Sequence, residues 1–88
     1  MYLARFVLVG NSPPLQSEAE LLGDTLWAHL SHGRGVEHIT ATATPAGIDL
    51  ALFLSRDIAD LDPVHYARLL LTEISPCSPL AQRWLQQL

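Results

Sequence analysis

The segment VEHITATATPAGIDLALFLSR, residues 36–56, contains two runs in which two kinds of side chain alternate. In the second run, apolar residues occupy every other position: Ile48, Leu50, Leu52 and Leu54. In the first run, threonines alternate with alanines. Alternation with a period of two is typical of a β-strand that has two different faces. The Pro-Ala-Gly between the runs is typical of a tight turn. The segment therefore predicts a β-hairpin.

The position of the turn decides which residues of the hairpin lie opposite one another. With Ala46–Gly47 as a two-residue loop, Ala43 lies opposite Leu50 and Glu37 lies opposite Arg56. A three-residue loop sets the threonines against the leucines instead, because a shift by one residue exchanges the two faces. We therefore expect the two-residue loop, which keeps Ile39 and the alanines beside the leucines.

Residues 2–10, YLARFVLVG, are predicted to form another strand. Apolar side chains fall on both of its faces, and Arg5 is the one charged residue. Strands that are apolar on both faces lie in the centre of a sheet. The prolines that follow end the ladder because proline has no N–H to donate. We therefore expect residues 2–10 to form a central strand.

Residues 14–32 predict a helix. Apolar residues recur at spacings of three and four along one stripe: Leu15, Ala19, Leu22, Leu26 and Leu30. The candidate N-caps are Ser12, before two prolines, and Ser17, which with Glu20 matches a capping box. Gly33 supplies the stop signal.

Residues 57–75 predict a second helix, with Asp62 as its N-cap and Pro63 as its first residue. The tail, residues 80–88, fits either a short helix that starts at Ser78 and Pro79 or a final strand. A strand would complete the β-α-β-β-α-β order of a ferredoxin-like fold. A helix would leave three strands and one uncovered edge.

The expected fold class is α+β, ferredoxin-like or a truncated β-α-β-β-α form of it, in a single domain spanning residues 1–88. Right-handed crossovers place both helices on one face of the antiparallel sheet. The opposite face, called the open face below, is expected to carry the following interface residues: Arg5, Val7, Val9, Thr40, Thr42, Ala51 and Phe53. Such a mixture of apolar and small residues suits contact with another protein surface.

Charge and cysteine content exclude several classes of function. The formal net charge is −4, and the five arginines are scattered in a chain that contains no lysine. A nucleic-acid-binding protein needs a clustered basic surface, so we expect no nucleic-acid partner. The lone Cys77 cannot form a disulfide within the chain, which fits a reducing compartment. The sequence shows no signal peptide and no membrane span, so a cytoplasmic location is expected.

Few residues suggest chemistry. His38 and Asp49 fall on the open face and form a candidate ligand-binding or acid–base pair. His29 and His32 are three residues apart, but His38 is not expected to reach them, and a zinc site needs at least three convergent ligands. We therefore expect no metal, no cofactor and no catalytic residue.

These observations favour a small non-catalytic protein-interaction or regulatory module. Its partner is expected to be a second copy, bound through the open face, or a larger bacterial protein. The alternative is a small enzyme of the dimeric α+β barrel kind, or a ligand-binding domain, that takes an apolar metabolite. The enzyme would need a pocket reached by His38, Arg5 or Asp49.

Overall fold

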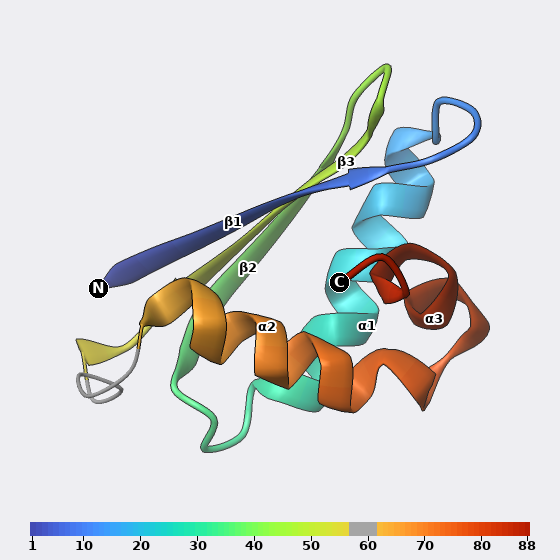
Figure 1. The fold of residues 1–88 in the computed structure, drawn as a ribbon. Coiled ribbons are helices and arrows are strands. Elements are labelled where there is room, and N and C mark those ends of the chain that lie inside the picture. Colours follow the sequence, from blue (N-terminus) through green and yellow to red (C-terminus); the bar gives the residue numbers. More distant parts are fainter. Residues whose placement is uncertain (57–61) are drawn as a thin grey trace.

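The computed structural model describes residues 1–56 and 62–88. The elements follow in the order β1 (Tyr2–Val9), α1 (Gln16–Leu30), β2 (Val36–Ala43), β3 (Gly47–Leu54), α2 (Pro63–Ile74), the 3₁₀ turn η2 (Ser75–Cys77) and α3 (Pro79–Leu85). Figure 1 shows a layer of three strands with the helices packed against one side of it. The fold is therefore α+β, as the sequence predicts.

The three strands form an antiparallel sheet in the order β1-β3-β2. The expectation that residues 2–10 form a central strand is wrong: β1 lies at an edge and β3 lies in the centre. The apolar residues on the second face of β1 are exposed instead of covered. The reason is the tail, which forms α3 and so provides no further strand beside β1.

The hairpin register differs by two residues from the predicted one. Thr44 N–H donates to Gly47 O at 2.7 Å and Gly47 N–H donates to Thr44 O at 3.2 Å, so the loop is Pro45–Ala46. Ala41 therefore lies opposite Leu50. An even shift preserves the faces, and the predicted grouping of alanines with leucines is confirmed.

A bulge between Val36 and His38 ends the regular pairing of β2 with β3. Glu37 is the extra residue of this bulge and has no partner position on β3. The predicted pair of Glu37 and Arg56 is therefore wrong. An inserted residue of this kind bends the strand and increases its local twist.

The core lies between the sheet and the helices. Its β-strand members alternate with exposed or half-buried residues, and β3 contributes Ile48, Leu50, Leu52 and Leu54, all at most 1% exposed. The apolar stripe of α1 and one side of α2 complete this cluster. Four members of the predicted stripe are confirmed, since Ala19, Leu22, Leu26 and Leu30 are fully buried. The prediction is wrong for Leu15, which precedes the first helical residue and is 73% exposed.

The helix starts are partly as predicted. Asp62 caps α2, accepting from Val64 N–H at 2.8 Å and from His65 N–H at 3.3 Å, and Pro63 opens the helix. For α1 the expectation is wrong: neither Ser12 nor Ser17 is its cap, because the helix begins at Gln16 after Leu15, which makes no side-chain cap bond. No helix in the described ranges has the length and apolar character needed to cross a membrane.

The tail forms α3, so the helical alternative is confirmed. Ser78 caps it, accepting from Ala81 N–H at 3.1 Å. Trp84 anchors the helix: its side chain is buried, and its indole N–H donates to Glu18 Oε2 of α1 at 2.7 Å. Gly10 leaves room for the ring, since a Cβ there would lie 2.7 Å from Trp84 Cη2.

Gly47 lies where the backbone of β3 passes close to that of β1. A Cβ at this position would lie 1.8 Å from the carbonyl oxygen of Leu8 on β1. Real Cβ atoms do not come this close to backbone oxygen, so no larger residue fits while β1 keeps its place. The glycine that resembles a turn residue in the sequence is therefore the buried first residue of β3.

Candidate interaction surface

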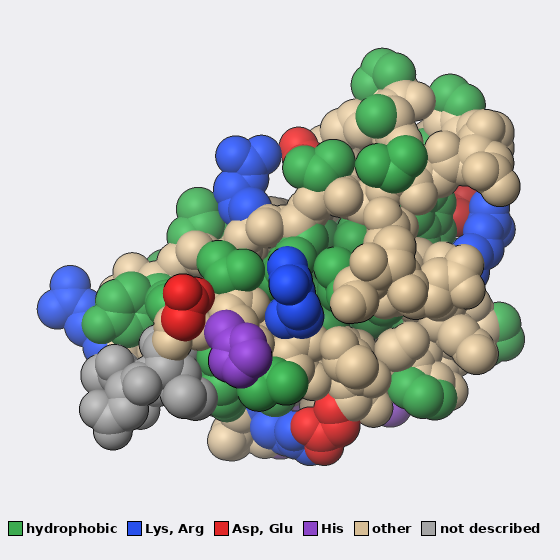
Figure 2. Space-filling view, in the orientation of Figure 1, with side chains coloured by type: hydrophobic (Ala, Val, Ile, Leu, Met, Phe, Trp, Pro, Cys, Tyr) green, Lys and Arg blue, Asp and Glu red, His purple; other side chains and the backbone are tan. Residues whose placement is uncertain are grey.

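The open face carries exposed apolar side chains in one row of β1. Leu3 is 50% exposed, Val7 is 62% exposed and Val9 is 61% exposed. Ala51 and Phe53 on β3 are half-buried, and Thr40 and Thr42 on β2 are exposed. In the space-filling view, hydrophobic side chains occur along the strand layer with single charged groups between them (Figure 2).

All seven residues predicted for the open face belong to the alternating rows that do not face the helices. The predicted interface residues do not include Leu3, although it belongs to the same row. The signal was present, because Leu3 is two residues from Arg5 and side chains two apart in a strand share a face. With Leu3 included, the apolar part of the open face is concentrated on β1.

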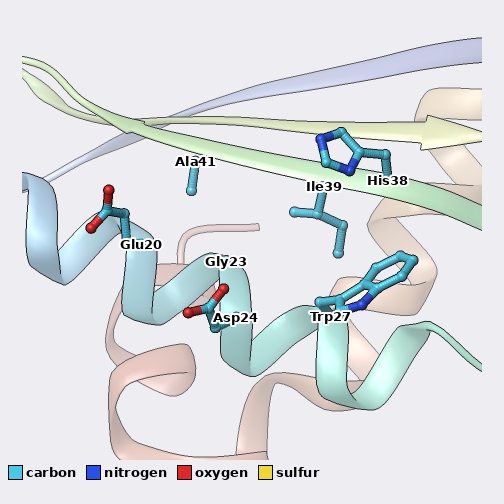
Figure 3. Close-up of a pocket in the computed structure, with 7 residues that line it drawn as sticks. All are labelled: Glu20, Gly23, Asp24, Trp27, His38, Ile39 and Ala41. Atoms are coloured by element: carbon cyan, nitrogen blue, oxygen red, sulfur yellow. The ribbon is translucent and has the colours of Figure 1, made fainter.

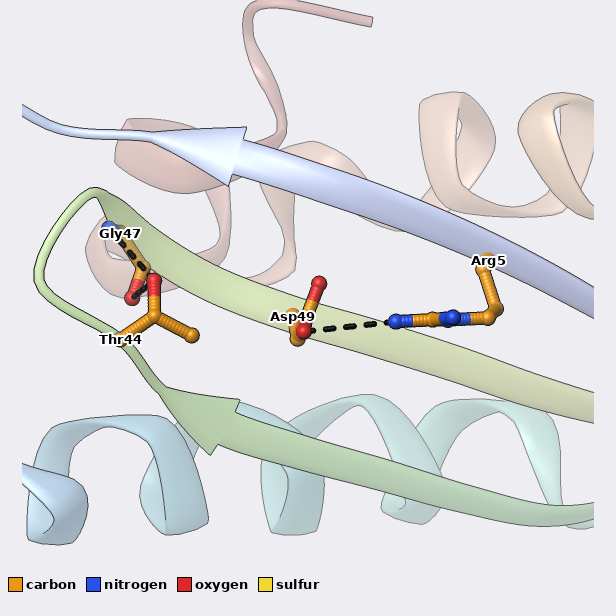
Figure 4. Close-up of polar contacts among 4 residues, drawn as sticks. All are labelled: Arg5, Thr44, Gly47 and Asp49. Carbon is orange, nitrogen blue, oxygen red and sulfur yellow. Dashed lines mark hydrogen bonds and ion pairs between the residues drawn. The ribbon is translucent and has the colours of Figure 1, made fainter.

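One ion pair crosses this face. Arg5 Nη2 lies 3.4 Å from Asp49 Oδ2 on the neighbouring strand β3 (Figure 4). Both side chains keep substantial solvent exposure, so the pair adds little to stability. Its effect is local, since it places a positive and a negative group together and leaves this part of the face without net charge.

His38 and Asp49 have different partners. The ring of His38 packs against Phe53 with 5.7 Å between ring centroids, while Asp49 pairs with Arg5. Asp49 lies opposite Thr42, four residues along β2 from His38, which is about 13 Å of strand. An acid–base pair needs hydrogen-bond reach, and the backbone positions of these two residues do not bring them that close.

The hydrogen-bonding pattern leaves one side of each outer strand free. Gly10 N–H donates to Ala46 O at 3.1 Å, so in β1 the even-numbered residues bond to β3. The odd-numbered residues direct their backbone groups outward. At Val9 the side chain of Gln87 substitutes for a strand: Val9 N–H donates to Oε1 at 3.0 Å and Nε2 donates to Val9 O at 3.2 Å.

The outer edge of β2 follows the same rule. The Thr44–Gly47 pair bonds across the hairpin, so Ile39, Ala41 and Ala43 direct their backbone groups away from β3. Ala43 N–H donates to Oε1 of Gln16, the first residue of α1, at 2.8 Å. Each outer strand is thus closed at one end by a glutamine side chain.

A groove runs between α1 and the edge of β2. Its volume is about 340 Å³, and seven residues line it: Glu20, Gly23, Asp24, Trp27, His38, Ile39 and Ala41. In Figure 3, Ile39 and Ala41 point from the strand toward the helix, and the helix presents two carboxylates and the indole beside them. Trp27 is 40% exposed, so much of its ring is accessible from solvent.

Sequence reasoning missed this groove, although α1 carries a readable signal. The helical residues of the groove recur at spacings of three, one and three, which is a single helix stripe: Glu20, Gly23, Asp24 and Trp27. The stripe lies beside the buried apolar one. What the sequence does not show is that β2 is the outermost strand of the sheet, which leaves this stripe uncovered.

A second ion pair lies on the helix side. Arg34, in the loop before β2, donates from Nη1 to Glu73 Oε2 at 2.9 Å and from Nη2 to Oε1 at 3.3 Å. This bidentate contact lowers the pKa of Glu73 and raises that of Arg34, through the hydrogen bonds first and the charge attraction second. Tyr66 of α2 donates from its hydroxyl to Arg34 O at 2.5 Å.

No three His, Cys, Asp or Glu side chains lie together in a metal-binding arrangement within residues 1–56 and 62–88. Cys77 is exposed and free.

Comparisons of the chain with protein-family models, with curated proteins and with solved structures found no match. Among the described residues, two surface features stand out: an apolar row on the open face, and a groove lined by two carboxylates beside the outer edge of β2.

Proposed function

We propose that this chain is a non-catalytic association module that binds a second copy of itself through the open face. The observation that carries the proposal is the row of Leu3, Val7 and Val9, which are at least half exposed on one strand. Contiguous exposed apolar side chains on a small domain tend to mark a contact site. Phe53 and Ala51, half-buried beside this row, extend the apolar surface toward the centre of the sheet.

The charges of the open face support a second copy as the occupant. A twofold interface brings the same residues of both copies together, so a face of one sign would repel itself. Arg5 and Asp49 hold both signs 3.4 Å apart, and in a dimer each pair can meet the opposite sign of the other. The formal charge of −4 on the whole chain therefore does not act at the centre of the contact.

The size of the face sets the expected strength. Three strands of eight residues give a surface about 26 Å long and about 14 Å wide. Specific stable interfaces bury roughly 800 Å² on each partner, and this footprint is about half of that. We therefore expect a weak, reversible dimer with a dissociation constant of micromolar or above.

We also infer that the fold is a ferredoxin-like arrangement without its last strand. In the full arrangement, two split β-α-β units place β1 between β3 and a fourth strand. The order β1-β3-β2 with the helices on one face fits this pattern with the outermost strand removed. The guanidinium of Arg68 lies 6.0 Å from the ring centre of Phe6, so this arginine of α2 reaches the helix side of the edge strand β1.

The test is sedimentation velocity across concentrations from 10 µM to about 1 mM, a range chosen from the expected affinity. We expect the weight-average mass to rise with concentration for the unchanged chain. Val7→Asp should weaken association at least tenfold, because it buries a carboxylate in the contact. The matched control is Leu21→Asp, since Leu21 is 58% exposed and lies on α1; it should associate like the unchanged chain.

Two results would contradict the proposal. A monomer throughout the range would remove the second copy as the partner. Equal weakening by Val7→Asp and Leu21→Asp would show that the association depends on general surface charge and not on the open face.

A further inference from the structure

We propose that the groove between α1 and β2 binds the cationic side chain of an extended peptide from another protein, and that this peptide pairs as a strand with the free edge of β2. The proposal is independent of the open face, because the groove lies at a different edge of the sheet. It combines three features: a backbone edge and two carboxylates that have no partner among residues 1–56 and 62–88, and an exposed indole.

The free edge supplies the backbone contacts. Ile39 and Ala41 direct their N–H and C=O groups away from β3, and no described residue bonds to these groups. The free stretch is bounded by the bulge at Glu37 on one side and by the Gln16 bond to Ala43 on the other. This leaves room for about five residues of an added strand, which is close to the usual length of a β-strand.

The direction of the side chains links the edge to the groove. Ile39 and Ala41 lie on the helix side of the sheet, and residues directly opposite one another in adjacent antiparallel strands share a face. A partner residue opposite Ala41 or Ile39 therefore directs its side chain toward α1. Ala41 is small, and Gly23 approaches it closely, since a Cβ on Gly23 would lie 3.4 Å from Ala41 Cβ.

The groove chemistry favours a cation. Glu20 and Asp24 are one helical turn apart, and neither has an ion-pair partner among the described residues. Trp27 follows on the same stripe, where its ring can bind the stem or the charge of a lysine or arginine. A volume of about 340 Å³ lies at the lower end of ligand pockets, which suits one side chain better than a whole metabolite.

The partner is a separate basic segment and not a second copy. The chain contains no lysine, and its five arginines are dispersed over the sequence. Opposite charges arranged across an edge select the partner and its register more than they add affinity. The rim residue His38 is the other titratable group of the groove, and its imidazole lies on the strand side, away from the two carboxylates in Figure 3.

The test uses ¹⁵N-labelled full chain and three seven-residue peptides of alternating threonine and valine, whose central residue is lysine, norleucine or glutamate. We expect the lysine peptide to shift the amide signals of Ile39 and Ala41 and the indole signal of Trp27. Asp24→Asn should weaken this binding about three- to fivefold, as for a partly exposed ion pair. The matched control, Glu73→Gln, removes the same charge outside the groove and should leave the affinity unchanged.

Several outcomes would overturn the proposal. One is an equal response to the lysine, norleucine and glutamate peptides, and another is no response at peptide concentrations of several millimolar. Shifts at Leu3, Arg5 and Val7 would place the peptide on β1 instead. If Ile39 and Ala41 shift with protein concentration alone, a second copy occupies this edge. Val7→Asp should bind the peptide normally, so a failure of the open-face dimer does not affect this result.

Discussion

The two outer strands, β1 and β2, end the same sheet with different chemistry. Each has eight residues, and each is closed at one end by a glutamine side chain, Gln87 at Val9 and Gln16 at Ala43. Along β1 the side chains beside the free backbone groups are mainly apolar and lie on the open face. Along β2 the free backbone groups accompany side chains that lie on the helix side, next to two carboxylates.

Because of this difference, a strand added at one edge of the sheet would meet other side chains than a strand added at the other edge. A strand that paired with β1 would place every second side chain on the open face, beside Leu3 and Val7. A strand that paired with β2 would place every second side chain on the helix side, next to the groove with Glu20 and Asp24. Backbone groups are alike at both edges, so under the two proposals above the side chains would decide which partner each edge accepts.

The largest expected effect on stability comes from displacing the edge strand β1. Gly47→Ala places a Cβ where the Leu8 carbonyl oxygen lies, 1.8 Å away, so β1 must leave its register on β3. We expect a loss of at least about 3 kcal/mol of unfolding free energy, measured by urea denaturation. Gly23→Ala is the control, because its Cβ meets Ala41 at 3.4 Å and alanine favours a helix; equal destabilisation of both variants would contradict the steric argument.

A medium effect is expected from removing the glutamine side chains that close the outer strands, and it differs between β1 and β2. Gln87 makes three hydrogen bonds, two to Val9 and one from Nε2 to Trp84 O at 3.1 Å, whereas Gln16 makes the single bond to Ala43. We expect Gln87→Ala to cost about 1–1.5 kcal/mol and Gln16→Ala about 0.5–1 kcal/mol in urea unfolding. Gln86→Ala, an exposed neighbour, should change stability least, and a larger loss for Gln16→Ala than for Gln87→Ala would reverse the inferred order.

The smallest effect concerns the loop that leads into β2. The pKa of Glu73 is lowered by its contact with Arg34, so the folded chain binds this proton less readily than the unfolded chain does. The stabilisation is therefore present above the ordinary value of 4.5 and is lost as the pH falls through the lower folded value. Glu73→Gln should flatten this acid-side decline slightly in thermal melts between pH 6 and pH 3. A decline identical to that of the unchanged chain would exclude a contribution from this pair.

Much of the fold could be predicted because it depends on local periodicity. The period of two in the hairpin separates its faces, and the spacing of three and four in α1 identifies its buried stripe. The short-range chemistry of Asp62 with Pro63, and of Ser78 with Pro79, fixes two helix starts. These signals depend on neighbours in sequence, so they can be read without coordinates.

The errors come from contacts between distant segments. Gly47 resembles a turn residue, but the carbonyl of Leu8 requires a glycine within β3, and this moved the loop to Pro45–Ala46. The tail was ambiguous because its helix is held by Trp84 against Glu18, 66 residues away in sequence. The groove was missed for the same reason, since it exists only where α1 extends past the last strand of the sheet.

The central position of β3 also implies an order of assembly. Its pairs with β2 are joined by a two-residue loop, whereas 37 residues (10–46) separate the paired Val9 and Gly47, and more separate the pairs toward the other end. Closing the longer loop has the larger entropic cost, so the hairpin can form early and β1 docks late. Docking of β1 covers an edge of β3 that could otherwise pair with another chain, so we expect variants that loosen β1 to aggregate more readily than the unchanged chain.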